Sequence, residues 1–183
     1  MSGASSYKRW FYLLLGIGVV ARLFGAWCYQ YTHNLDFQVV AMMVKHMAEG
    51  TDYPVFFYGQ SYMGSLEPGM SALLAKIFGF SPFIVCLGTS VFAIALLPVV
   101  YGWARDVGGE VCGLVAMGLM IIGPEGYFHY MASARGGYTV TLLFGALIVW
   151  LSSCWQTASP EGTQKGTTTI WTRRWPSRFL SRS

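Results

Sequence analysis

Charged side chains are scarce in this sequence. Only 11% of its 183 residues are Asp, Glu, Lys or Arg, whereas 54% are hydrophobic. A typical soluble domain carries about 25% charged residues, so this chain would cover a water-exposed surface only with difficulty. A bilayer is the simpler solvent, and the composition favours an all-α, multi-pass membrane protein.

Several familiar catalytic motifs are also missing. The sequence contains no Walker loop, no HExxH, no GxSxG and no Rossmann fingerprint, so soluble nucleotide chemistry is not indicated. Its cysteines lie in or beside apolar runs without CxxC spacing: Cys28, Cys86, Cys112 and Cys154. We interpret them as small packing residues, because neither a metal site nor a disulfide framework fits this spacing.

Long apolar runs are what the sequence has instead. They cover residues 10–31, 83–104, 111–123 and 138–155. About 20 helical residues cross the hydrocarbon core, so the first two runs qualify and the fourth nearly does. The third spans only if its helix continues past Pro124. We therefore expect about four transmembrane helices, near residues 10–31, 83–104, 110–130 and 137–155.

Basic residues set the expected orientation. With the N-terminus inside, the cytoplasmic side carries Lys8, Arg9, Arg105 and five basic residues from Lys165 onward. The opposite side carries Lys45 and Lys76, with Arg135 close to the membrane. This asymmetry predicts a plasma (inner) membrane protein with both termini in the cytoplasm and residues 32–82 outside it.

The two ends of the sequence differ from its middle. Residues 1–9 are a short polar leader, and the run after them is longer than a signal-peptide core and lacks a cleavage site, which predicts a retained signal anchor. Residues 156–183 are rich in Ser, Thr and Arg. We expect a disordered basic cytoplasmic tail without a nucleic-acid partner. The abrupt change of composition also suggests a frameshift or premature stop in a longer gene.

The first extracytoplasmic loop has a pattern of its own. Phe37, Val40, Val44 and Met47 form one helical stripe that ends at Gly50. A second short helix is expected near residues 69–80, too short to span. We expect both helices to lie on the membrane surface. The aromatic stretch FFYGQSYMGSLEP between them is interpreted either as a lid or sugar platform, or as a belt of interfacial aromatic residues.

Two acidic residues are candidates for catalysis. Asp36 opens the first loop helix, where it acts either as a helix cap or as a carboxylate that takes a proton or holds a cation. Glu125 lies at the outer end of the third apolar run, either as a solvated acid or facing a cavity. His129 follows four residues later and would share its helical face.

A phosphate site is suggested by SARGGY, residues 133–138. An Arg beside two glycines before a helix offers a guanidinium and backbone amides, although Arg135 could also be an interfacial anchor. Arg22, inside the first apolar run, must snorkel or face the bundle interior. The candidate substrate-binding residues are Arg135, Tyr138, His129, Tyr58, Gln60 and Glu67.

The order of these features resembles the front of the GT-C superfamily of membrane glycosyltransferases. MAEGTDYPVFFYGQSYMGSLEPG, then KIFGFSPF, leads into an apolar run ending YGWARDVGG. The layout over residues 8–155 is most similar to the protein O-mannosyltransferase and aminoarabinose-transferase group. There, the first outer loop carries two juxtamembrane helices and a catalytic Asp, often followed by Glu. The resemblance implies sugar transfer from a polyprenyl-phosphate donor to an extracytoplasmic acceptor.

By position, Asp36 matches the loop acid of that family, while Phe37 stands where Glu is usual. Glu125 is the nearest substitute for a second outer acid, and a divalent-cation requirement is left open. We expect the chain to be the N-terminal part of such an enzyme, with membrane lipid and the sugar donor as partners. The alternative is a non-catalytic polytopic protein, a transporter fragment or assembly subunit, with a membrane-protein partner.

Overall fold

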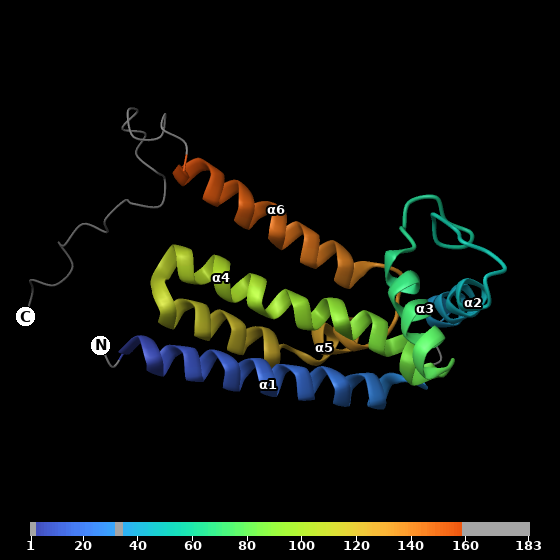
Figure 1. Ribbon diagram of the computed structural model, residues 1–183, viewed down its shortest axis with the longest axis horizontal. Helices are drawn as coiled ribbons and strands as arrows, with labels where there is room; N and C mark the ends of the chain where they lie inside the picture. The colour runs from blue at the N-terminus through green and yellow to red at the C-terminus, as the bar shows by residue number, and fades with distance from the viewer. Residues whose placement is uncertain (1–2, 32–34, 159–183) are drawn as a thin grey trace, which may run out of the picture. The chain divides into compact units, whose positions relative to one another are not determined.

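The computed structural model describes residues 3–31 and 35–158. These residues form six α-helices and no strand, which confirms the all-α class (Figure 1). The helices are α1 (Gly3–Tyr29), α2 (Leu35–Glu49), α3 (Leu66–Phe78), α4 (Pro82–Ile122), α5 (Glu125–Ala132) and α6 (Tyr138–Ala158). The chain divides into two compact units, residues 1–148 and 149–183. Each is described by itself, and the second only as far as Ala158.

Three helices are long and apolar enough to cross a membrane: Ser5–Tyr29, Pro82–Ile122 and Tyr138–Gln156. They support the expected membrane architecture. Two expected boundaries change. The leader is not separate, because α1 already begins at Gly3 and no helix breaker lies between Gly3 and Trp10. The predicted tail starts at residue 156, which still belongs to α6. Residues 159–183 of the predicted tail lie outside the described residues.

Helix α4 is a pair of helical arms joined at Gly109. Gly109 has φ 83° and ψ 179°, a left-handed region backbone that side chains disfavour. Figure 1 shows the ribbon reversing direction between the two arms. The arms touch closely, since a Cβ at Gly113 would lie 2.9 Å from the Tyr101 ring. The expected runs 83–104 and 111–123 therefore fold as a hairpin.

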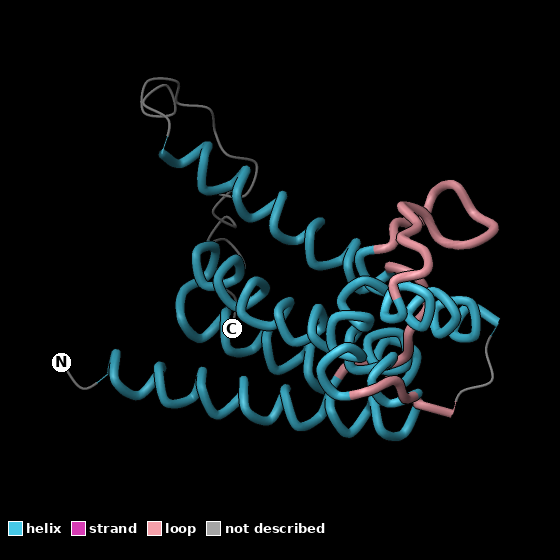
Figure 2. The backbone as a smooth tube through the Cα atoms, turned by 45° about the vertical axis from the view of Figure 1, so that its right-hand side comes forward, coloured by secondary structure: helices cyan, strands magenta, loops and turns pink. Residues whose placement is uncertain are grey.

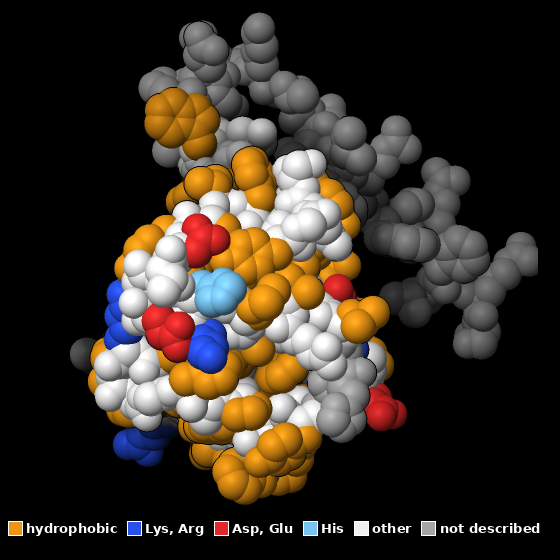
Figure 3. Space-filling model, turned by 90° about the vertical axis from the view of Figure 1, so that its right-hand side faces the viewer, with side chains coloured by type: hydrophobic (Ala, Val, Ile, Leu, Met, Phe, Trp, Pro, Cys, Tyr) orange, Lys and Arg blue, Asp and Glu red, His pale blue; other side chains and the backbone are white. Residues whose placement is uncertain are grey.

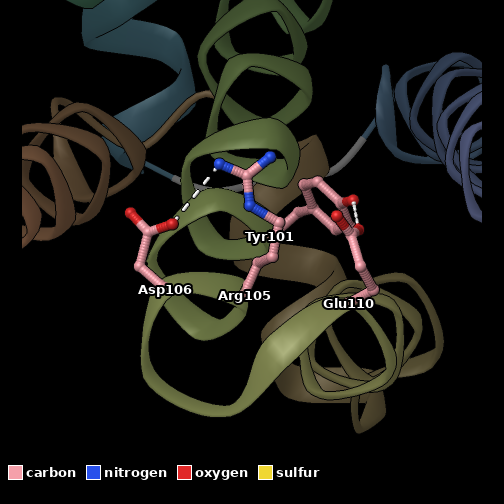
Figure 4. A network of polar contacts seen from close by, with 4 residues as sticks. All are labelled: Tyr101, Arg105, Asp106 and Glu110. Atoms are coloured by element: carbon pink, nitrogen blue, oxygen red, sulfur yellow. Dashed lines mark hydrogen bonds and ion pairs between the residues drawn. The ribbon is translucent and has the colours of Figure 1, made fainter. Parts of the chain in front are cut away.

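Polar side chains surround this reversal (Figure 4). The Tyr101 hydroxyl donates a hydrogen bond to Glu110 across the turn. Arg105 pairs with Asp106, with 3.3 Å between Nη2 and Oδ1, and its guanidinium lies 5.8 Å from the centre of the Tyr101 ring. Because the pair is well exposed, it contributes at most about 1 kcal/mol. Of these polar contacts, the bond between Tyr101 and Glu110 is the one that joins the two arms.

The second arm does not continue through Pro124, so the expected continuous helix over residues 110–130 is wrong. Pro124 has no backbone N–H and cannot bond to the carbonyl of Met120 four residues earlier. The helix ends at Ile122, and α5 begins at Glu125.

Arg22 compensates for this break. Its side chain is 1% exposed, and its Nη2 donates to the Met120 carbonyl at 2.6 Å. The guanidinium also lies 5.4 and 5.1 Å from the ring centres of Tyr127 and Phe128. A cation at a helix C-terminus is favoured by the helix dipole. Of the two interpretations of Arg22, the structure supports the one in which it faces the bundle interior.

Close approach of backbones brings α1 against both arms of α4. A Cβ at Gly18 would lie 2.4 Å from the Leu97 side chain and 3.3 Å from Ile121. Leu97 and Ile121 form a buried cluster together with Met117, and the partly buried Phe11, Leu14 and Leu15 of α1 pack against it. The first unit thus has a core of three helical segments.

Helices α2 and α3 pack at the end of this core where α1 ends and α4 begins (Figure 1). The predicted stripe is confirmed as the packing face of α2: Val40 and Val44 are buried, and Phe37 and Met47 pack against the same cluster. Ser71 of α3 donates to the Val85 carbonyl of α4 at 2.9 Å.

The connection between α2 and α3 extends beyond the helices (Figure 2). The face of the molecule at this end carries mainly apolar and neutral side chains with a few scattered charges (Figure 3).

Candidate functional site

Glu67 is the centre of a buried network. Its side chain is 1% exposed, in the first turn of α3. The Thr89 hydroxyl and the Arg135 backbone N–H donate to Oε1 at 2.8 and 3.1 Å, and the Gly137 N–H donates to Oε2 at 2.7 Å. Burial raises the pKa of the Glu67 carboxyl, while these donated bonds act in the opposite direction. The carboxyl group therefore ties α3 to α4 and to the loop before α6.

The loop geometry explains why its amides reach Glu67. Gly136 and Gly137 have φ of 82° and 112°, which side chains rarely adopt. A Cβ at Gly136 would also lie 2.7 Å from the Phe57 ring. The prediction that SARGGY offers backbone amides to a phosphate is wrong for Arg135 and Gly137, because these amides already donate to a carboxylate of the same chain.

The Arg135 guanidinium points to a different set of groups. Its Nη2 lies 2.6 Å from His129 Nε2, and its Nε donates to the Ser133 hydroxyl at 3.2 Å. It also lies 4.6 Å from the centre of the Tyr130 ring, which meets the Tyr138 ring edge-on at 5.7 Å. The structure thus brings together three predicted residues, Arg135, His129 and Tyr138.

The contact between Arg135 Nη2 and His129 Nε2 determines the protonation state of His129. Arginine stays protonated in proteins and only donates, so Nε2 of His129 must accept and the ring must be neutral. The ring also lies 4.4 Å from that of Tyr29, which places the end of α1 beside α5.

A pocket of about 680 Å³ lies beside the Arg135 cluster. It has the size of a small-molecule site. Its lining comes from the α2–α3 connection, α3, α5, the glycine loop and the first turns of α6: Tyr62, Met63, Gly64, Leu66, Glu67, Tyr127, Tyr130, Met131, Gly136, Gly137, Tyr138, Val140, Thr141 and Leu142. The lining combines four tyrosines with aliphatic and methionine side chains.

The two predicted catalytic acids lie elsewhere. Asp36 is half-buried in the first turn of α2, and Glu125 is exposed in the first turn of α5. Neither lines the pocket. Glu125 shares a helix with His129, one turn apart, as the spacing predicts. The catalytic role of both acids stays a prediction.

Tyr58 and Gln60 also lie outside the pocket lining. The Tyr58 hydroxyl donates to Asp52 at 2.5 Å and lies 3.0 Å from His46 Nδ1. This bond to Asp52 is the main cause that raises the pKa of Tyr58. Because Tyr58 has one proton and gives it to Asp52, His46 must be the donor in the second contact. In Gln60, Oε1 is buried and has no hydrogen-bond partner within the described residues.

Three tyrosines of the site were missed from the sequence: Tyr62, Tyr127 and Tyr130. Tyr127 and Tyr130 are three apart in GYFHYM, so their helical spacing was an available signal. Tyr62 belongs to the aromatic stretch already noted. Nothing in the sequence shows that these segments meet.

Residues 3–31 and 35–158 hold no group of three or more His, Cys, Asp or Glu side chains that could bind a metal ion. No family model, curated protein or solved structure matches the sequence or the fold.

Proposed function

We propose that the protein is an integral membrane glycosyltransferase of the GT-C type, which transfers a sugar from a polyprenyl-phosphate donor to an extracytoplasmic acceptor. The observation that supports it best is the neighbourhood of Arg135. A guanidinium lies over the ring of Tyr130, which lines a pocket of about 680 Å³ that also includes Val140 and Leu142 of α6. Such a site suits an amphiphile with a phosphate group and an apolar chain.

The proposal includes four membrane crossings and two surface helices. The reversal at Gly109 supports counting the arms of α4 separately, and α1 and α6 supply the others. The second arm rises only about 20 Å, so α5 completes the path to the level of Tyr29. Only residues 79–81 separate α3 from α4, which favours a place for α3 at the membrane surface.

In the proposed reaction, the acceptor hydroxyl attacks the anomeric carbon of the sugar. The bond from that carbon to the phosphate oxygen breaks, and the phosphate leaves with the electron pair. Arg135 would stabilise the departing charge, and Asp36 would take the hydroxyl proton. The role of Asp36 rests on the resemblance of its position to the family's loop acid.

The test separates binding from transfer. We expect Asp36→Asn to abolish transfer of radiolabelled sugar from a polyprenyl-phosphate donor to an acceptor, and to leave donor binding unchanged. Arg135→Gln should weaken donor binding itself, because it removes the guanidinium that lies against Tyr130 of the pocket lining. Asp52→Asn is the matched control, since Asp52 bonds to Tyr58 outside the pocket. Transfer at the normal rate by Asp36→Asn would refute the assignment.

One observation favours the alternative, a non-catalytic polytopic protein. Neither Asp36 nor Glu125 lines the pocket, and the acid that does, Glu67, is held by Thr89 and two backbone amides. This alternative predicts that function tolerates Asp36→Asn and Glu125→Gln. It also predicts purification with another membrane protein and without bound prenyl lipid.

A further inference from the structure

Glu67 lines the pocket but offers little of itself to a ligand. Its side chain is 1% exposed, and its two oxygens already accept three hydrogen bonds from Thr89, Arg135 and Gly137. A buried carboxyl group costs free energy unless its oxygens are hydrogen-bonded, so these three contacts account for its place in the core. The proposed reaction, which uses Asp36 and Arg135, leaves Glu67 without a role.

The glycine loop, residues 133–137, depends on this carboxylate for its position. Arg135 and Gly137 flank Gly136, and their N–H groups donate to the two oxygens of Glu67 at 3.1 and 2.7 Å. Gly136 and Gly137 have φ of 82° and 112°, and glycine loses more backbone freedom on folding than any other residue. Because a hydroxyl of α4 also donates to the carboxylate, the loop is held against both α3 and α4.

The backbone of Arg135 sets where its guanidinium can reach. Its Nη2 lies 2.6 Å from His129 Nε2, its Nε donates to Ser133 Oγ at 3.2 Å, and its guanidinium lies 4.6 Å from the centre of the Tyr130 ring. An arginine side chain loses rotamer freedom when it is held in one geometry. All three contacts can form together only while the backbone of Arg135 stays in place, and Glu67 supplies that anchor from α3.

We propose that Glu67 is a positioning residue for Arg135. Its carboxylate binds the N–H groups of Arg135 and Gly137, and thereby holds the guanidinium over Tyr130, where it meets the phosphate of the donor lipid. The inference rests on the proposed function and adds a residue that acts without touching the donor. Glu67, a candidate substrate-binding residue in the sequence, thus acts through the glycine loop.

The experiment is a double-mutant cycle on the full chain in phosphatidylcholine nanodiscs, with a polyprenyl phosphate that carries no sugar as the probe. We expect Glu67→Gln and Arg135→Gln each to lower the affinity about tenfold. In the Arg135→Gln background, Glu67→Gln should change the affinity by less than about twofold, because the guanidinium that it positions is gone.

The other results separate the two proposals. A full second loss in the double variant would overturn the inference, because Glu67 would then support binding independently of Arg135. An unchanged affinity in Glu67→Gln alone would overturn it as well. Both results leave the proposed function standing. A parent chain that does not bind polyprenyl phosphate would overturn the proposed function together with the inference.

Ser71→Ala is the matched control for a loss of packing. Ser71 is fully buried on α3, one turn after Glu67, and it donates to the Val85 carbonyl of α4 at 2.9 Å without contacting the glycine loop. We expect its loss to change the affinity by less than about twofold. A loss equal to that of Glu67→Gln would assign the effect to the packing of α3 and contradict the proposal.

A second variant moves the loop from its other side and keeps the carboxylate. A Cβ at Gly136 would lie 2.7 Å from the Phe57 ring, in a backbone conformation with φ of 82°. Gly136→Ala should therefore displace the loop, lower the affinity in the parent chain and change it by less than about twofold in the Arg135→Gln background. An unchanged affinity in Gly136→Ala would overturn the proposal, because the position of the loop would not matter to Arg135.

Discussion

Replacing Glu67 by Gln tests the buried network with almost no change of shape. Glu67 accepts bonds on both oxygens, but a glutamine has one oxygen and an NH2 group that cannot accept. If the Gln oxygen faces Thr89 and the Arg135 amide, the NH2 group faces the Gly137 N–H. One buried donor then loses its partner and meets another donor.

The magnitude follows from these contacts. A buried donor left without a partner costs about 1–3 kcal/mol, so we expect Glu67→Gln to destabilise the chain by about 2 kcal/mol. This corresponds to a fall in Tm of about 4–8 °C for a chain of this size. Thr89→Val removes one donor and leaves the other two bonds, so it should cost about 1 kcal/mol.

The assay uses Cys86, which is fully buried. In a variant with Ser at Cys28, Cys112 and Cys154, a thiol-reactive dye reports the temperature at which Cys86 becomes accessible in detergent. A Tm for Glu67→Gln within about 1 °C of the parent would refute the reasoning, because it would mean that the amides of the glycine loop do not depend on the carboxylate.

Three other outcomes are expected. Pro124→Ala supplies an N–H to the Met120 carbonyl, so Arg22→Leu should lower the free energy of unfolding by about 1 kcal/mol less in that background than in the parent chain. Equal losses in the two backgrounds of a double-mutant cycle would contradict the role of Arg22. Gly88→Ala should lower Tm by several degrees, because its Cβ would lie 2.7 Å from a backbone nitrogen of α3. Gly16→Ala is the control, because a Cβ at Gly16 meets nothing within 4 Å. His129 accepts from the Arg135 guanidinium only while its ring is neutral, so acidification that protonates the ring should break this contact and lower Tm. His129→Gln should flatten that part of a pH–Tm curve, and an unchanged slope would count against it.

The sequence predicted features that depend on local spacing. The stripe of α2 was readable because its apolar residues recur at helical intervals. The break at Pro124 was also visible, but the apolar run 111–123 is too short to span alone, so a fourth crossing required the helix to continue past Pro124. Two separate spans near residues 83–104 and 110–130 required a reversal between them, but its position at Gly109 was not predicted, since a glycine pair in the sequence does not show its φ.

The candidate site was harder to predict, because its contacts link distant parts of the chain. The hydrogen-bond partners of Glu67 are separated from it by 22, 68 and 70 positions in the sequence, and no local sequence pattern predicts such partners. The cluster of Arg135 and His129 was anticipated in part, because these residues are only six apart.

The separation of Glu67 from its partners also sets an order of events during synthesis. Thr89 emerges from the ribosome soon after Glu67, but the amides of Arg135 and Gly137 follow only when about 70 further residues have been made. Until then two of the three groups that donate hydrogen bonds to the carboxylate have not been made. The outer layer of the first unit is therefore completed late, when the start of α6 is in place, and the pocket does not exist before that step.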